Sequence, residues 1–315
     1  MLYSSRLEER FAIIVRCNLH MLKYPLSERR FRSLLFVPGN RHDRIRKAWS
    51  SGADAIILDL EDSVPESEKP AARTIIREVL KNPVIEGPMI LLRINPLSTS
   101  LWRKDLDESL GESIGAIVVP KCDSSDGIRE LESILETQES RCGLVAGSTA
   151  LFLLIETARG LLEAAKLAQA SERVAALVFG GEDYCLDMEI TRTADGAELS
   201  YARSHVALSA RAYGCLAIDT IYADFTDTEG VTRDSEAAKR AGFSGKLAVH
   251  PSQVKVINSV FAPTDQELTE ARRVVEAFRD AEGRGQGVIA LEGRMIDRPI
   301  AERARRLLKS CGVTL

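Results

Sequence analysis

The chain has 315 residues, of which 45 % are hydrophobic and 28 % charged, a balance typical of a folded globular protein and not of a disordered one. Lys and Arg number 42 against 46 Asp and Glu, and the net charge of −4 gives no reason to expect nucleic acid or an acidic membrane surface as a partner. No apolar run approaches the ~20 residues that span a bilayer, and the six cysteines form no CxxC pair. We therefore expect a cytoplasmic protein with reduced thiols.

Residues 1–30 are charged and irregular, and we interpret them as an N-terminal extension with a short helix over 7–22. From residue 31 onward, short apolar runs alternate with longer amphipathic segments. Several runs are apolar without alternation, as strands buried on both faces are. Eight strands are predicted, over residues 33–37, 55–60, 89–94, 116–119, 151–155, 175–179, 216–218 and 246–249. Helices are predicted between them, over residues 43–51, 69–80, 101–110, 127–136, 160–170, 201–212 and 235–241.

This alternation of strand and helix predicts an α/β fold, a parallel sheet closed into a (β/α)8 or TIM barrel over residues 31–262. An open doubly wound sheet is the alternative, but no glycine-rich phosphate-binding sequence follows the first strand. Residues 263–315 predict an extra C-terminal helical segment, with a helix over 264–281, a hairpin over 288–296 and a helix over 299–309. Because this segment lies beyond the barrel, we expect it to pack on the barrel or on a neighbouring subunit.

Ionisable or amide residues follow almost every predicted strand. In a barrel the carboxyl ends of the strands form the active-site rim, so these side chains are expected to share one face. In chain order they are Asp59, Glu61, Asp62, Arg93, Asn95, Lys121, Glu156, Glu182, Asp183, Asp219, Asp224, His250 and Gln253. One acidic residue in such a place is usually a solvated loop charge, but charges after so many strands indicate a functional site.

The carboxylates at this rim exceed what acid–base chemistry needs, and they repel one another unless a cation offsets them. Oxygen ligands without clustered His or Cys suit Mg²⁺, which takes one or two protein carboxylates together with water and substrate oxygens. Glu156 and Asp183 end neighbouring strands and can share one ion; alternatively, Glu156 is a carboxylate at the start of a helix. Arg93 is the candidate for binding an anionic substrate, or it forms a buried ion pair with Asp59 or Glu61.

Two further rim residues admit two roles each. Lys121 could act as an electrophile or form a Schiff base, but without a clear apolar pocket around it a structural ion pair is favoured. We place Lys121 and Asp62 among the residues near the substrate. His250 has no second histidine at ligand spacing, which favours a hydrogen-bonded rim residue over a metal ligand.

The segments around these strand ends resemble those of the citrate lyase β-subunit-like (CitE-like) family, part of the wider HpcH/HpaI aldolase and malyl-CoA lyase group. The longest matches are RSLLFVPGN at residues 32–40 and ADAIILDLEDSV at 53–64. Shorter matches follow in order, at residues 92–95, 119–121, 155–158, 179–183, 242–246, 250–253 and 293–297. The sequence departs from the family pattern at Gly181, where many relatives carry Ala, and at Tyr184, where many carry Leu.

The resemblance implies a barrel that assembles into trimers or hexamers and takes an acyl-CoA substrate. It implies Mg²⁺ as cofactor, held by Glu156 and Asp183, and it places Arg93 on the small acid of the substrate. It also implies that Phe31 and Arg32 lie near the CoA. The residues before Phe31 have no counterpart in the family pattern.

Asp297 matches an aspartate that, in lyases and synthases of this group, reaches from the C-terminal segment into a neighbour's active site. The resulting hypothesis is a Mg²⁺-dependent carbon–carbon lyase that cleaves a 3-hydroxyacyl-CoA, citramalyl-CoA or malyl-CoA, to acetyl-CoA and pyruvate or glyoxylate. Arg93 would stabilise the developing oxyanion and Asp297 would protonate the acetyl-CoA enolate. Asp59, Glu61 and Asp62 would orient Arg93 and the waters around the metal.

Three alternatives stay open. The first is a citrate lyase β subunit, whose acyl group is carried by an acyl carrier protein and not by free CoA. The second is a malyl-CoA thioesterase, which would release free CoA. The third is a non-catalytic metabolite-binding barrel, against which the acidic rim and Arg93 speak.

Overall fold

The structure is a computed structural model that describes residues 31–81 and 87–313. The helix predicted over 7–22 lies outside these residues. The chain forms two compact units, the first ending at Phe261 and the second beginning at Ala262. In the described part of the chain, no helix combines the length and the apolar character needed to cross a membrane.

In the first unit, eight parallel strands close into a barrel, because each strand pairs with the next and β8 returns to β1. They are β1 (Ser33–Pro38), β2 (Ala55–Asp59), β3 (Met89–Arg93), β4 (Ile114–Val119), β5 (Ala150–Ile155), β6 (Val174–Phe179), β7 (Leu216–Asp219) and β8 (Gly245–Ala248). The predicted (β/α)8 barrel is confirmed, and each predicted strand agrees with the observed one to within two residues at either end.

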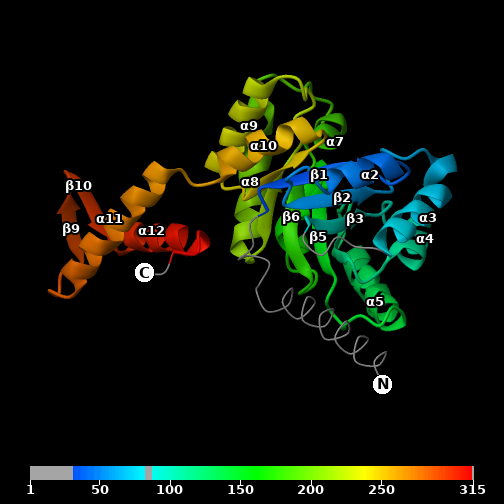
Figure 1. Ribbon diagram of the computed structural model, residues 1–315, viewed down its shortest axis with the longest axis horizontal. Coiled ribbons are helices and arrows are strands. Elements are labelled where there is room, and N and C mark those ends of the chain that lie inside the picture. Colours follow the sequence, from blue (N-terminus) through cyan, green and yellow to red (C-terminus); the bar gives the residue numbers. More distant parts are fainter. Residues whose placement is uncertain (1–30, 82–86, 314–315) are drawn as a thin grey trace, which may run out of the picture. The chain divides into compact units, whose positions relative to one another are not determined.

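Helices fill the gaps between the strands and surround the barrel (Figure 1). They are α2 (His42–Ala48), α3 (Lys69–Leu80), α4 (Leu101–Ser109), α5 (Ser125–Arg141), α6 (Ala158–Leu167), α7 (Gly181–Asp187), α8 (Ser200–Ala212), α9 (Thr228–Ala241) and α10 (Pro251–Phe261). Short 3₁₀ turns, η2 (Glu66–Glu68) and η3 (Ala197–Leu199), precede α3 and α8. The short helix α7 was not predicted, because its first turn, with Gly181, Glu182 and Asp183, carries no apolar residue that would mark a helical period.

Side chains along each strand alternate between the barrel interior and the outer face that packs on the helices. Ile57 of β2 and Leu154 of β5 belong to the interior cluster. Two residues further along, at the carboxyl ends of the strands, Asp59 and Glu156 continue on the same side and are almost fully buried. The apolar interior of the barrel therefore ends in a layer of buried charges.

The acidic residue at the end of β7 faces the other way. Ile218 lies in the interior cluster, so the next residue, Asp219, faces the helices. There it accepts two hydrogen bonds of 2.9 Å from Arg203 of α8 and one of 2.6 Å from Lys246 of β8. Asp234 of α9 pairs with the same two cations. The expectation that Asp219 belongs to the rim is wrong, because its charge ties α8 and α9 to the sheet.

The second unit follows the predicted order of helix, hairpin and helix. It consists of α11 (Asp265–Glu282), the antiparallel strands β9 (Val288–Leu291) and β10 (Arg294–Asp297), and α12 (Arg298–Ser310). Thr264 caps α11 in a reciprocal capping box with Glu267. The second unit has a small core of its own, in which Val274 and Phe278 of α11 pack with Ile296 of β10.

Candidate active site

Asp59 and Arg93 form the centre of the charged layer. They stand opposite each other in the pairing of β2 with β3. The guanidinium donates from Nε to Oδ1 and from Nη2 to Oδ2 of Asp59, both at 2.6 Å. Burial alone would raise the pKa of Asp59, but the Arg93 charge, its hydrogen bonds and that of Ser63 lower the pKa below its usual value. The predicted ion pair is present, and it holds the guanidinium in one orientation.

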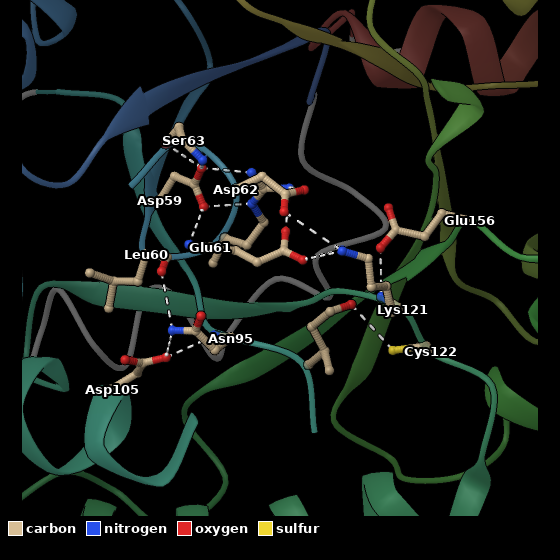
Figure 2. A network of polar contacts seen from close by, with 12 residues as sticks. Asp59, Leu60, Glu61, Asp62, Ser63, Asn95, Asp105, Lys121, Cys122 and Glu156 are labelled. Atoms are coloured by element: carbon tan, nitrogen blue, oxygen red, sulfur yellow. Dashed lines mark hydrogen bonds and ion pairs between the residues drawn. The ribbon is translucent and has the colours of Figure 1, made fainter. Parts of the chain in front are cut away.

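Glu61 connects Arg93 to Lys121. Figure 2 shows the contact between Glu61 and Lys121. Its Oε2 lies 2.8 Å from Nη1 of Arg93, and its Oε1 accepts a hydrogen bond of 2.8 Å from Nζ of Lys121. Asp62 is exposed and lies farther away, 3.7 Å from Lys121 and 3.9 Å from Arg93. Burial of the Glu61 carboxylate raises its pKa although both cations act against the shift. Lys121 thus makes the ion pair that its sequence context favoured.

Glu156 lies beside this group and is buried with little compensation. Among the described residues, its carboxylate accepts one hydrogen bond, of 2.6 Å from the backbone N–H of Lys121. Lys121 has a φ of 52°, a left-handed conformation rare for residues with a side chain. Burial raises the pKa of Glu156 to about 8, and the negative charges of Asp183 and Glu61 add to the shift.

Asp183 completes the acidic group from the first turn of α7. Burial raises its pKa, and the Lys121 charge lowers it only in part. No three or more His, Cys, Asp and Glu side chains within residues 31–81 and 87–313 are grouped so as to hold a metal by themselves. The residues present fit Mg²⁺, because two carboxylate ligands suffice for this ion and a cation would offset the repulsion that burdens Glu156 and Asp183.

A second set of polar residues supports this site: Asn95, which was expected at the rim, and Lys69 and Asp105, which were not. Lys69, at the start of α3, donates three hydrogen bonds: to the carbonyls of Leu60 and Glu61 and to Oδ1 of Asn95. Asn95 in turn donates to Asp105 of α4 through its backbone N–H and its side chain. Nothing in the sequence marks Lys69, since a lysine in a first helical turn is usually exposed.

Phe31 and Arg32 lie elsewhere. They precede β1 and therefore stand at the amino ends of the strands, opposite the charged layer. Arg32 makes a forked ion pair with Asp54, which precedes β2, at 2.9 and 2.7 Å. Phe31 packs edge-on against Phe152 inside the barrel, with ring centroids 5.7 Å apart. The structure does not bring these two expected CoA contacts to the rim.

Asp297 belongs to the second unit, where it ends β10 and caps α12. Its Oδ1 accepts a hydrogen bond of 3.2 Å from the backbone N–H of Ile300.

At the rim, His250 stacks on Phe225 at 4.7 Å and its Nδ1 lies 2.7 Å from the hydroxyl of Ser252. His250 therefore has the hydrogen-bonded position that its sequence context favoured.

Gly180, directly after β6, makes room for Glu156, and replacing it tests how finely this carboxylate is placed. A Cβ at Gly180 would lie 2.6 Å from the Cβ of Glu156 and 2.5 Å from its Oε2, so the whole side chain would have to shift. We expect Gly180→Ala to lower kcat/KM of the activity proposed below by roughly 10–100-fold, as misplacement by about 1 Å does. Gly111→Ala, with open space around it, is the matched control; equal activity of both variants in a steady-state assay would contradict the expectation.

A closed (β/α)8 barrel with buried carboxylates and an arginine at the carboxyl ends of its strands has the architecture of a barrel enzyme. The sequence model of the HpcH/HpaI aldolase/citrate lyase family matches residues 32–251. The chain belongs to this family, and the CitE-like resemblance of its motifs is confirmed.

Relatives in this family carry different activities. The citrate lyase subunit beta of Leuconostoc mesenteroides is 37 % identical, over 90 % of this chain and 94 % of its own length. The mitochondrial citramalyl-CoA lyase of Rattus norvegicus is 31 % identical, over 88 % of this chain and 85 % of its own. The crystal structure of CitE from Mycobacterium tuberculosis, in complex with magnesium, acetoacetate and coenzyme A, superposes with a TM-score of 0.74 at 31 % identity and covers 90 % of this chain and 99 % of that one.

Proposed function

We propose that this protein is a Mg²⁺-dependent carbon–carbon lyase that cleaves a 3-hydroxyacyl-CoA of the citramalyl-CoA or malyl-CoA type to acetyl-CoA and a 2-keto acid. The observation that carries the proposal is the pair of carboxylates, buried Glu156 and half-buried Asp183, beside an arginine that two further carboxylates hold in place. The magnesium, acetoacetate and coenzyme A bound to the M. tuberculosis relative support the same chemistry.

Glu156 and Asp183 are the residues that would hold the ion. When bound, Mg²⁺ supplies Lewis-acid stabilisation of negative charge on substrate oxygens. Arg93 adds a fixed positive charge next to that position, and because Asp59 and Glu61 already orient it, no reorganisation is needed as charge develops. Both carboxylates of the ion site are buried or half-buried, which keeps water from screening these interactions.

Lys121 and Asp62 would contact the larger part of the substrate, since they are the more exposed members of the group. Asp297 of a neighbouring subunit would deliver the proton that converts the enolate carbon to the methyl group of acetyl-CoA. The proposal therefore includes a homo-oligomer, trimer or hexamer, with Asp297 donated between subunits. We do not assign Phe31 and Arg32 to the CoA, because they stand at the opposite end of the barrel.

A citrate lyase β subunit is the second candidate, favoured by the 37 % identity to the Leuconostoc relative. In that case the acyl group would arrive on a carrier protein and free acyl-CoA would not suffice. A malyl-CoA thioesterase would instead hydrolyse the thioester and release free CoA.

The test is incubation of the purified protein with Mg²⁺ and citramalyl-CoA, malyl-CoA or citryl-CoA, with EDTA as the control. We expect metal-dependent release of acetyl-CoA together with pyruvate or glyoxylate. Both products are measured by chromatography. Cleavage of citryl-CoA alone, or of a citryl thioester only when it is attached to a carrier protein, would favour the citrate lyase reading. Free CoA with an intact hydroxy acid would mark a thioesterase.

A further inference from the structure

The ammonium group of Lys69 binds the backbone of the turn that carries Asp59 and Glu61. Lys69 is buried, and its Nζ lies 2.7 Å from the carbonyl oxygen of Leu60, 3.0 Å from that of Glu61 and 2.6 Å from Oδ1 of Asn95. All three of its N–H groups are thus used on neutral oxygens. Among the described residues, Lys69 takes part in no ion pair, although the turn above it carries three carboxylates.

The partners of Lys69 are themselves fixed. Asn95 donates to Oδ2 of Asp105 twice, from its backbone N–H at 2.8 Å and from Nδ2 at 2.6 Å. Oδ1 of Asp105 accepts a hydrogen bond of 2.7 Å from Arg73, one helical turn beyond Lys69 on α3. Nδ2 of Asn95 also reaches the Leu60 carbonyl at 3.1 Å (Figure 2). The helix α3 and the turn are therefore joined through a closed set of buried hydrogen bonds.

The backbone of the turn then has little freedom. The N–H of Leu60 donates to the carbonyl of Arg93, the N–H of Glu61 donates to Oδ1 of Asp59, and Lys69 binds the carbonyls of both turn residues. With both peptide groups fixed, the side chain of Glu61 leaves the turn in one direction, toward Arg93 and Lys121.

We propose that Lys69 is a positioning residue of the active site, which acts by holding the backbone at Leu60 and Glu61 so that the Glu61 carboxylate bridges Arg93 and Lys121. The expected effect of Lys69 on kcat rests on the proposed function, whereas its effect on the geometry of the turn does not. It predicts that Lys69 contributes to catalysis only through Glu61 and has no contact with the substrate.

A double-mutant cycle between Lys69→Met and Glu61→Gln tests the proposal. We expect Lys69→Met alone to lower kcat by roughly 10–100-fold, because the group that orients Arg93 moves by a fraction of an ångström or more. In the Glu61→Gln background the same substitution should change kcat by less than about 3-fold, since its target is already lost. Arg77→Met, at an exposed position of the same helix, should leave kcat unchanged.

Amide hydrogen exchange gives a readout that needs no activity. Lys69→Met should speed exchange across residues 60–64 by more than ~10-fold while Arg77→Met does not. Equal losses of kcat in both backgrounds, or unchanged exchange in this turn, would overturn the proposal. If wild-type protein cleaves none of the thioesters, the proposed function fails, and the exchange experiment still decides the role of Lys69. Should Lys69→Met not fold, Lys69→Gln, which keeps two donors, is expected to show the same effects at smaller size.

Discussion

Replacing Glu156 by Gln is expected to abolish most of the Mg²⁺-dependent cleavage while leaving the metal-free protein at least as stable as wild type. Gln keeps the shape and can still accept the hydrogen bond from the Lys121 backbone. It removes one of the ion's two proposed ligands, so kcat/KM should fall by more than ~100-fold, the upper end of what losing a partner behind a metal ligand costs. In the metal-free protein, burial and the charges of Asp183 and Glu61 raise the pKa of Glu156 to about 8, so this carboxyl is mostly neutral at pH 7; Gln, which is also neutral, should not lower the Tm in EDTA.

Thermal unfolding with and without Mg²⁺ is the measurement that separates these effects. Wild type should gain stability from bound metal, about 2.7 kcal/mol at a hundredfold excess over Kd, and Glu156→Gln should gain little. Glu112→Gln, at an exposed position, serves as the control and should behave as wild type in both conditions. A Mg²⁺-induced rise in Tm of normal size in Glu156→Gln would show that the ion is held elsewhere.

Arg93→Gln is the second substitution with a large expected effect, because it damages both stability and catalysis. The guanidinium is the charge partner of the fully buried Asp59, and breaking a buried pair by removing one member costs roughly 3–5 kcal/mol. Loss of its charge next to the developing oxyanion should lower kcat on the order of 10²–10³-fold.

The double variant Asp59→Asn, Arg93→Gln separates the two consequences. It leaves no buried charge unpaired at this position, so most of the lost stability should return in denaturant unfolding while activity stays low. Recovery of kcat along with stability would mean that Arg93 acts only on the fold and not on the reaction.

The barrel was accessible from the sequence because its strands are short, apolar and evenly spaced between amphipathic segments. The rim position of Asp59 and Glu156 was predicted from the strand ends; the inward direction of their side chains follows from the period-two alternation along the observed strands. Arg93 and Lys121 show how far such reasoning reaches: both were expected at the rim with carboxylate partners, and the structure places each beside Glu61.

The residues that were not predicted correctly depend on the direction in which a side chain points, or on contacts between helices and strands that are far apart in the sequence. Asp219 ends its strand as Asp59 does, but it lies one residue after the inward-facing Ile218, so the alternation of side chains turns it toward Arg203 and Lys246. Lys69 is indistinguishable in sequence from an exposed helical lysine, since only the folded turn supplies its carbonyl partners. Phe31 and Arg32 precede the first strand, so chain order alone places them at the amino ends of the strands; their expected position near the CoA came from the family resemblance and not from this order.

The pairing of β1 with β8 also bears on how the chain reaches this fold during synthesis. Ser33 pairs with Lys246, so the first strand has an open edge until more than two hundred further residues have been added. Once residue 219 has been added, Asp219 and Arg203 can already pair, but Lys246, the buried ammonium that also binds Asp219 and Asp234, is still to come. Closure of the barrel and full neutralisation of the buried Asp219 and Asp234 therefore coincide. We expect a nascent chain to be most exposed to edge-to-edge association just before its eighth strand emerges.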